Sequence, residues 1–369
     1  MHDRREQPAK PGARQRMYTD TSSTHQYSHD RAIAAWLFIC CAMVFAMVIL
    51  GGVTRLTGSG LSMVEWDPIF GIIPPLDHET WQATFDLYKQ SPEYLKINAG
   101  MDLAGFQQIY WFEFFHRLLG RLIGTVFLLP FLYFLIRGWV KRPLILPLAG
   151  MFILGGLQGL LGWYMVKSGL VDNPHVSQYR LTAHLGLAVI IYGYMLYVAL
   201  GLWFGVQRTA AVPAALRRAT AALWVLIFVT LLSGGFVAGL KAGFAYNTFP
   251  LMNGRLVPES LLVQEPLWRN FFENVATVQF DHRLLAITVL LGIVALWLAG
   301  RQAPLPRQAR VGVNLLLAAG ILQVSLGIST LLLRVPVVLA SAHQAGALLL
   351  FSVALFLYHR MRHGTGSAY

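Results

Sequence analysis

Four histidines are the residues of this chain most suited to chemistry, because each lies inside a long apolar segment. They are His116, His184, His282 and His343. A titratable side chain within an apolar membrane segment is costly, so its presence there is by default a functional hypothesis. Two imidazoles that face each other across a helical bundle, without cysteines or clustered carboxylates, suit axial ligation of haem iron better than zinc, which takes four ligands. We expect one haem for each pair of histidines.

Four cations lie near these histidines in the sequence. Arg117 and Arg283 each directly follow a histidine, and a guanidinium binds carboxylates such as haem propionates through charge-assisted hydrogen bonds. Arg55 and Lys241 follow the first and fifth apolar segments and are further candidates for this role. For these two residues, a charge that faces solvent or lipid headgroups is an equally good interpretation.

One carboxylate, Glu113, distinguishes the first pair of histidines from the second. It stands three residues before His116, whereas Gln279 takes the corresponding position before His282. Residues three apart on a helix share a face, so Glu113 should look into the same site as His116. We predict that it orients water, accepts a proton or stabilises developing positive charge there. The alternative is that Glu113 only complements the positive start of its helix.

The histidines belong to an internal repeat of the chain. Four short strings recur in its second half, pairing residues 115–119 with 281–285, 157–162 with 322–327, 183–186 with 342–346, and 51–52 with 234–235. Each repeat contains an even number of apolar segments, so both halves should insert with the same orientation. We therefore predict a pseudo-two-fold axis along the membrane normal.

The composition requires a membrane environment. Of the 369 residues, 56% are hydrophobic and 12% are charged, whereas about 25% are charged in a soluble domain. A bilayer core of about 30 Å needs about 20 apolar residues per helix. Eight such runs occur, at residues 32–53, 108–136, 144–166, 181–204, 219–240, 278–298, 311–333 and 337–359. The prediction is an all-α polytopic membrane protein with eight transmembrane helices in two tandem four-helix bundles.

The net charge of +12 follows the membrane topology and does not indicate a nucleic-acid partner. Basic residues gather at alternate helix ends, which is the positive-inside pattern. We therefore expect both termini in the cytoplasm and the histidines towards the opposite, outer side. The predicted parts are a disordered cytoplasmic tail at 1–31, an N-terminal bundle at 32–207 with a long, partly helical outer loop at 55–107, a C-terminal bundle at 208–360 and a cytoplasmic tail at 361–369.

The two cysteines, Cys40 and Cys41, are adjacent within the first apolar segment. A disulfide between neighbours would be strained, and no other metal ligands are near them. We interpret both as packing residues.

Longer motifs extend from Gly51 to Gln344. They are GGVTRLTGSGLSM at 51–63, PEY at 92–94, EFFHR at 113–117, GWYMVKSGL at 162–170, YRLTAH at 179–184, NTFPLM at 247–252, FDHR at 280–283 and AHQ at 342–344. Together these strings resemble the haem A synthase family, and they are far more specific than any single histidine.

The resemblance implies a reaction, a cofactor and the residues for each. The C8 methyl group of haem O would be oxidised to a formyl group by successive hydroxylations, giving haem A for terminal oxidases. A resident haem b in the second half would transfer electrons, with His282, His343, Arg283 and Lys241 as its site residues. Haem O would bind in the first half, near His116, His184, Arg117, Arg55 and the catalytic Glu113.

The resemblance also implies partners and a location. These are haem O as substrate, haem O synthase as a donor of that substrate, an unidentified electron donor and membrane lipid, with a homo-oligomer left open. Some bacterial members carry a cysteine pair in the first outer loop, whereas this chain has cysteines only at positions 40 and 41. It therefore resembles the mitochondrial and proteobacterial branch, and we expect it in a bacterial inner membrane with the haem sites on the periplasmic side.

Two other classes of function stay open on the residues alone. A non-enzymatic di-haem b-type electron carrier would use paired transmembrane histidines in the same way. A transporter built from parallel repeats is the third class. The pigments bound by the purified protein distinguish the three.

Overall fold

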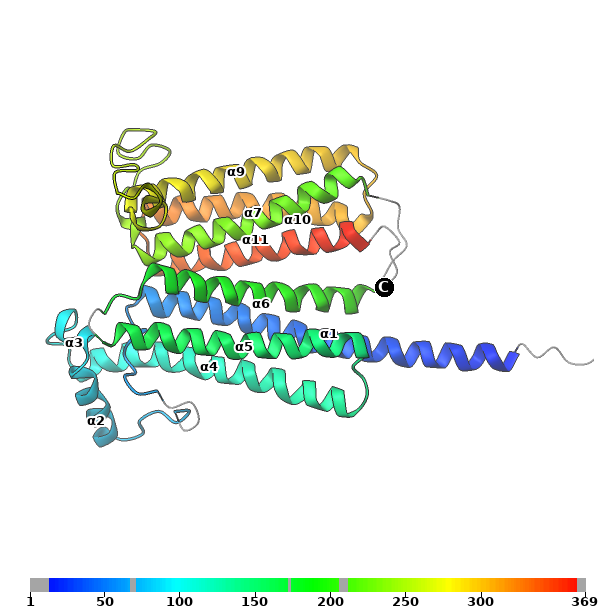
Figure 1. Cartoon of the computed structure of the whole chain (residues 1–369), viewed down its shortest axis with the longest axis horizontal. Coiled ribbons are helices and arrows are strands. Elements are labelled where there is room, and N and C mark those ends of the chain that lie inside the picture. The colour runs from blue at the N-terminus through cyan, green and yellow to red at the C-terminus, as the bar shows by residue number, and fades with distance from the viewer. Residues whose placement is uncertain (1–12, 67–70, 172–173, 206–211, 364–369) are drawn as a thin grey trace, which may run out of the picture.

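Eight long helices dominate the chain (Figure 1). The computed structural model describes residues 13–66, 71–171, 174–205 and 212–363. The long helices are α1 (Ala13–Leu56), α4 (Leu103–Ile136), α5 (Arg142–Gly169), α6 (Gln178–Phe204), α7 (Ala214–Gly239), α9 (Val275–Gln302), α10 (Arg307–Leu332) and α11 (Val337–His363). Each contains an apolar window long enough to cross a bilayer, and β-structure in the described ranges is limited to an isolated bridge between Met252 and Arg255. The prediction of an all-α polytopic protein with eight spans is confirmed.

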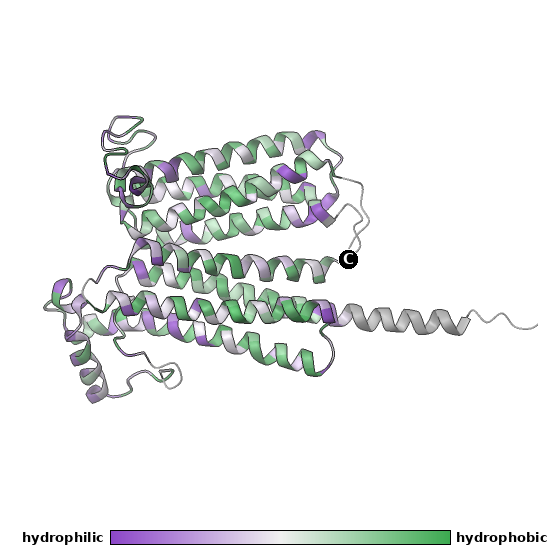
Figure 2. Ribbon diagram, in the orientation of Figure 1, coloured by the Kyte–Doolittle hydropathy of each residue, from purple (hydrophilic) through white to green (hydrophobic). Residues whose placement is uncertain are grey.

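The spans run side by side, with apolar residues along their middles and more hydrophilic residues towards their ends (Figure 2). Within the first half, α1 packs on α4, α4 on α5, α5 on α6 and α6 on α1. The second half repeats this order with α7, α9, α10 and α11. Between the halves, α6 contacts α7 and α11, and α1 contacts α11. The division into two bundles about a pseudo-two-fold axis stays a prediction.

Helix α1 begins much earlier than predicted. Residues 13–31, expected to belong to a disordered tail, are helical and continue into the first span, while residues 1–12 lie outside the described part. After Gly12, the sequence contains no proline or glycine before Gly51, so nothing interrupts the helix. The prediction of a disordered tail is therefore wrong for residues 13–31. Similarly, α11 continues to His363, within the predicted second tail, and residues 364–369 are not described.

The interior between the spans is apolar. Cys40 and Cys41 are buried in its main hydrophobic cluster and form no disulfide, which agrees with a packing role. The predicted boundary between residues 207 and 208 lies outside the described residues.

The long loop after α1 is partly helical, as expected, and contains α2 (His78–Lys89) and α3 (Pro92–Lys96). Asp77 and Thr80 form a capping box that starts α2, with the Thr80 backbone N–H donating to Asp77 Oδ1 at 2.8 Å. An aromatic cluster joins these helices to the start of α4. Its buried members are Phe85, Tyr88, Phe106, Tyr110 and Phe114, and Tyr94 of α3 packs against them. This packing fixes the two short helices as a cap on α4.

The corresponding connection in the second half is shorter. It contains the 3₁₀ turns η1 (Ala242–Phe244) and η2 (Leu267–Arg269) and the short helix α8 (Asn270–Glu273). Tyr179 at the start of α6 donates a hydrogen bond to Glu273 at 2.9 Å, which ties the first half of the chain to this connection.

Candidate functional site

The two histidines of the second half, His282 on α9 and His343 on α11, face each other. Their ring centroids are 6.4 Å apart and their planes are perpendicular, at 89°. Two metal–nitrogen bonds of about 2 Å each, plus about 1 Å from each nitrogen to its ring centre, span about 6 Å. The space between the rings therefore fits one metal ion with two axial imidazoles. In the described part of the chain, no three His, Cys, Asp or Glu residues gather into a conventional metal cluster.

Neighbouring helices hold both of these rings by their Nδ1 edges. The Ser233 hydroxyl on α7 lies 2.7 Å from His282 Nδ1. The Gln323 amide on α10 lies 3.1 Å from His343 Nδ1 and also donates to the His343 backbone carbonyl at 3.0 Å. Such contacts orient ligating imidazoles, and here they leave the two Nε2 atoms for a metal. The residues present therefore fit a haem with bis-histidine ligation.

A glycine on the preceding span supports each of the four histidines. The pairs are Gly51 with His116, Gly162 with His184, Gly234 with His282, and Gly327 with His343. A Cβ added at these glycines would approach a ring atom to between 2.8 and 3.2 Å, which is closer than ordinary van der Waals contact. The sequence shows that these glycines repeat, but small residues of this kind predict close helix packing in general and no specific role. Their recurrence at matched positions was the signal that could have identified them as histidine supports.

The first pair of histidines is held less completely. Gln158 on α5 contacts His184 as Gln323 contacts His343, with 3.1 Å to Nδ1 and 3.0 Å to the backbone carbonyl. The counterpart of the Ser233 hydroxyl is missing at His116, because Leu50 precedes Gly51 where Ser233 precedes Gly234 in the second half. No ring contact joins His116 to His184 within the described residues, in contrast to the second pair.

Glu113 is buried and fully engaged by donors. Its Oε2 accepts hydrogen bonds from the Ser62 hydroxyl at 2.7 Å and the Met63 backbone N–H at 2.8 Å. Its Oε1 accepts from Arg117 Nε at 3.0 Å and Nη2 at 2.5 Å. Glu113 also lies about three turns into α4, and a helix dipole acts only within the first turn. The alternative that it complements the start of the helix is therefore wrong.

Its counterpart Gln279 meets a loop of opposite polarity. The Gln279 amide donates to the carbonyl oxygens of Ala242 at 3.0 Å and Tyr246 at 3.3 Å. The first outer loop presents donors at this position, whereas the second presents acceptors. A carboxylate suits the first and an amide the second, so the Glu/Gln difference has a structural cause in the loops themselves.

Two of the four cations predicted to bind haem propionates, Arg117 and Arg283, donate their hydrogen bonds to other groups of the protein. Arg117 donates to the carbonyl oxygens of Met63 at 2.8 Å and Glu65 at 2.9 Å, in addition to its bonds with Glu113. Arg283 donates to the carbonyls of Tyr246 at 2.8 Å and Thr248 at 2.9 Å. Both guanidinium groups therefore anchor the outer loops.

The other two predicted ligands have side chains without a hydrogen bond or ion pair among the described residues. Arg55 is half-buried in the last turn of α1, one turn beyond the glycine that supports His116. Lys241 is exposed just after α7, where its φ of 53° helps to turn the chain. These two cations are better placed than Arg117 and Arg283 to meet a ligand.

The sequence of the chain matches known proteins. A family model described as cytochrome oxidase assembly protein, COX15-CtaA, matches residues 34–355. The chain is 56% identical to the haem A synthase of Nitrosospira multiformis over 340 residues, covering 91% of this chain and 95% of that protein. It is 46% identical to the haem A synthase COX15 of Bos taurus over 353 residues, covering 93% and 85% respectively. With a match of this length and identity, the chain belongs to the haem A synthase family of membrane enzymes.

Proposed function

We propose that the protein oxidises the C8 methyl group of haem O to a formyl group, with a resident haem b in its second half. The observation that carries this proposal is the difference between the two histidine pairs. His282 and His343 are preset at 6.4 Å with both rings fixed by neighbours, as a permanent ligand requires. His116 and His184 lack that ring contact, which suits a haem that must enter and leave.

Oxidation of the methyl group to a formyl group removes four electrons, so an oxidant such as dioxygen is needed besides the electron donor. Haem b, when bound, would supply one-electron transfer between that donor and the substrate haem. The task of the protein in that half is to hold this group. His282 and His343 bind its iron, Ser233 and Gln323 fix the rings, and Lys241 is the cation available to a propionate. Arg283 acts through the loop carbonyls that it anchors.

In the first half, His184 and His116 would bind the iron of haem O, and Arg55 a propionate. Two permanent axial imidazoles would leave no coordination position open for oxygen. Gln158 restrains His184 by hydrogen bonds, whereas the His116 ring makes no hydrogen bond among the described residues and rests against Gly51. We infer that His116 is the ligand that would dissociate from the iron of haem O to open a coordination position.

Glu113 would act on the methyl group through its charge. It lies on α4 three residues before His116, and four donors from Ser62, Met63 and Arg117 surround its carboxylate. This environment favours stabilisation of positive charge on the substrate over transfer of a proton. The first outer loop holds the carboxylate in position, and α2 and α3 exclude water above it.

We infer that the basic helix ends lie in the cytoplasm of a bacterial cell and that the histidines lie towards the periplasm. Support comes from the common start of α4, α6, α9 and α11 at the end of the bundle that carries α2 and α3 (Figure 1). Haem O synthase as substrate donor, a separate electron donor and a homo-oligomer belong to the same proposal.

Extraction of bound pigments tests the function. We expect protein purified from cells that make haem O to carry haem b together with haem O or haem A. His343→Ala should remove haem b, and His184→Ala should remove the haem O or haem A fraction while haem b is retained. Haem b alone in both halves would favour the electron carrier, and a protein free of haem would favour the transporter.

A further inference from the structure

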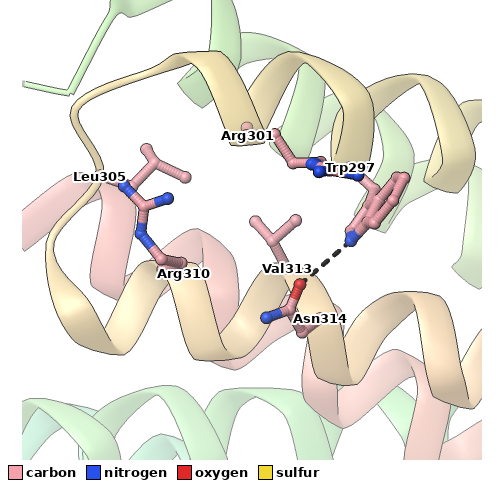
Figure 3. Close-up of a pocket in the computed structure, with 7 residues that line it drawn as sticks. Trp297, Arg301, Leu305, Arg310, Val313 and Asn314 are labelled. Carbon is pink, nitrogen blue, oxygen red and sulfur yellow. Dashed lines mark hydrogen bonds between the residues drawn. The ribbon is translucent and has the colours of Figure 1, made fainter.

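A cavity of about 360 Å³ lies between the end of α9 and the start of α10, at the end of the bundle from which α1 protrudes (Figures 1 and 3). It is far from the four histidines, each of which lies in the half of its helix that is nearer the other end of the bundle. Two arginines line it, Arg301 from α9 and Arg310 from α10, with Trp297 and Asn314 on the side towards the membrane interior.

Uncharged groups hold both arginines at the cavity. The guanidinium carbon of Arg301 lies 4.8 Å from the centre of the Trp297 ring, a cation–π contact. Arg310 donates from Nη2 to the carbonyl oxygen of Ala303 at 3.4 Å. Neither contact supplies negative charge, so within the described part of the chain no carboxylate offsets the two positive charges at the cavity.

The protein offers these arginines no nearby carboxylate in their part of the sequence. Asp281 is the last acidic residue, and the remaining chain to Tyr369 contains no Asp or Glu. The corresponding turn of the first half differs, because Lys141 there forms an ion pair with Asp30 at 2.7 Å. Among the described residues neither Arg301 nor Arg310 forms an ion pair, so both guanidinium charges are available to a bound anion.

The surroundings of the cavity identify the source of that anion. Leu298, Val311 and Leu315 are exposed on the adjoining helix surfaces, with 51%, 47% and 49% of their area accessible, which is typical of residues that face lipid chains. Asn314 accepts a hydrogen bond from Trp297 Nε1 at 3.0 Å, so its amide nitrogen is turned to the cavity (Figure 3). A phosphate bound between the arginines would thus stand directly above an apolar helix surface.

We propose that the α9–α10 cavity binds the phosphate group of an anionic phospholipid. Arg301 and Arg310 pair with the phosphate oxygens, Asn314 donates a further hydrogen bond, and the acyl chains lie along the exposed leucine and valine side chains. A free phosphate ion would satisfy the arginines equally well but would leave the apolar surface unused.

The test uses the full chain in nanodiscs of phosphatidylcholine with increasing fractions of phosphatidylglycerol, with retained lipids counted by native mass spectrometry. The variant is Arg301→Gln/Arg310→Gln. Its matched control is Arg217→Gln/Arg218→Gln, which removes the same charge at the start of α7. We expect the first variant to bind phosphatidylglycerol about 30-fold more weakly and the control to bind it as the unmodified chain does.

Equal retention of phosphatidylglycerol by the unmodified chain and the cavity variant would overturn the proposal. Protection of the site by millimolar inorganic phosphate, without any preference of the unmodified chain for phosphatidylglycerol over phosphatidylcholine, would also overturn it, because the site would then recognise a small anion and not a lipid. If the double variant does not fold, Asn314→Leu and Arg310→Gln are measured singly, and each should weaken retention by a severalfold factor. Unchanged retention in both single variants would count against the site.

Discussion

Arg117 and Glu113 lie one turn apart on α4 and are joined by two hydrogen bonds, at 3.0 and 2.5 Å, from the guanidinium to one carboxylate oxygen. The same two side chains hold the first outer loop through Ser62 and Met63. The equivalent residues of the second half, Arg283 and Gln279, hold their loop without a carboxylate. One structural element thus anchors the loop and, under the proposed function, places a negative charge beside the substrate.

Replacement of Glu113 by Gln separates these two roles. The amide keeps the shape of the side chain but loses the ion pair, which we expect to destabilise the loop by about 1–3 kcal/mol. Haem b spectra should be unchanged, while haem A output falls and haem O or a hydroxylated intermediate accumulates. Pigments are measured by extraction and chromatography. Normal haem A output from Glu113→Gln would exclude the catalytic role.

Substitution of the glycines that pack against the histidines should affect haem binding in one half of the chain only. Gly327→Ala places a Cβ 2.8 Å from His343 Cε1, so the ring must shift, and overpacking of this kind costs about 1–3 kcal/mol. We expect an altered haem b absorption spectrum and a lower haem b content. Gly162→Ala should instead affect the haem O or haem A fraction.

Gly155→Ala is the control for these substitutions, because a Cβ there meets no atom within 4 Å. It should leave both pigments unchanged and gain about 0.5–1 kcal/mol from helix propensity. An unaltered haem b spectrum in Gly327→Ala would show that the glycine does not position His343.

The two glutamines that contact histidines provide another pair of variants, each of which should affect one half of the chain only. Gln323→Leu removes the amide nitrogen that lies 3.1 Å from His343 Nδ1 and 3.0 Å from the His343 carbonyl oxygen, while the volume of the side chain is nearly kept. Loss of such an orienting partner commonly weakens metal binding 10–100-fold, so haem b should dissociate more readily. Gln158→Leu should leave haem b in place and lower binding of haem O, measured by titration. Equal effects of both variants on haem b would contradict the proposed assignment of the two halves.

The cap over α4 should be sensitive to pH through Glu93. This residue on α3 is 6% exposed, and Tyr88 donates to its Oε2 at 3.2 Å. Burial raises the pKa of Glu93 from 4.5 to about 7, and the nearby charge of Glu113 adds to the effect. The folded cap therefore retains a proton that the unfolded chain releases, so its stability is greatest below about pH 4.5 and falls as the pH rises through about 7.

Hydrogen exchange of residues 78–96 measures this stability. Exchange should be slower at about pH 5 than at about pH 8 once the intrinsic rates are corrected. Glu93→Gln should remove most of the difference, since the amide does not titrate. A pH dependence that persists unchanged in Glu93→Gln would assign it to another group.

Local patterns in the sequence were sufficient to predict the eight spans and to select the four histidines as candidate site residues. The hydropathy of about 20 residues, and the presence of a polar group among them, are properties of the segment alone. The repeat likewise paired Glu113 with Gln279 without coordinates. The prediction for residues 13–31 failed, because a polar composition is compatible with either a helix or an irregular tail.

Only the tertiary structure decided what each of these residues touches. The rotation and depth of neighbouring helices place the glycines under the imidazoles and set the 6.4 Å between His282 and His343. The paths of the outer loops bring backbone carbonyls to Arg117 and Arg283, which donate hydrogen bonds to them. The donors of the first loop suit the carboxylate of Glu113, and the acceptors of the second suit the amide of Gln279. Such contacts join residues far apart in the chain, and their geometry depends on how whole helices pack, which no single segment of sequence contains.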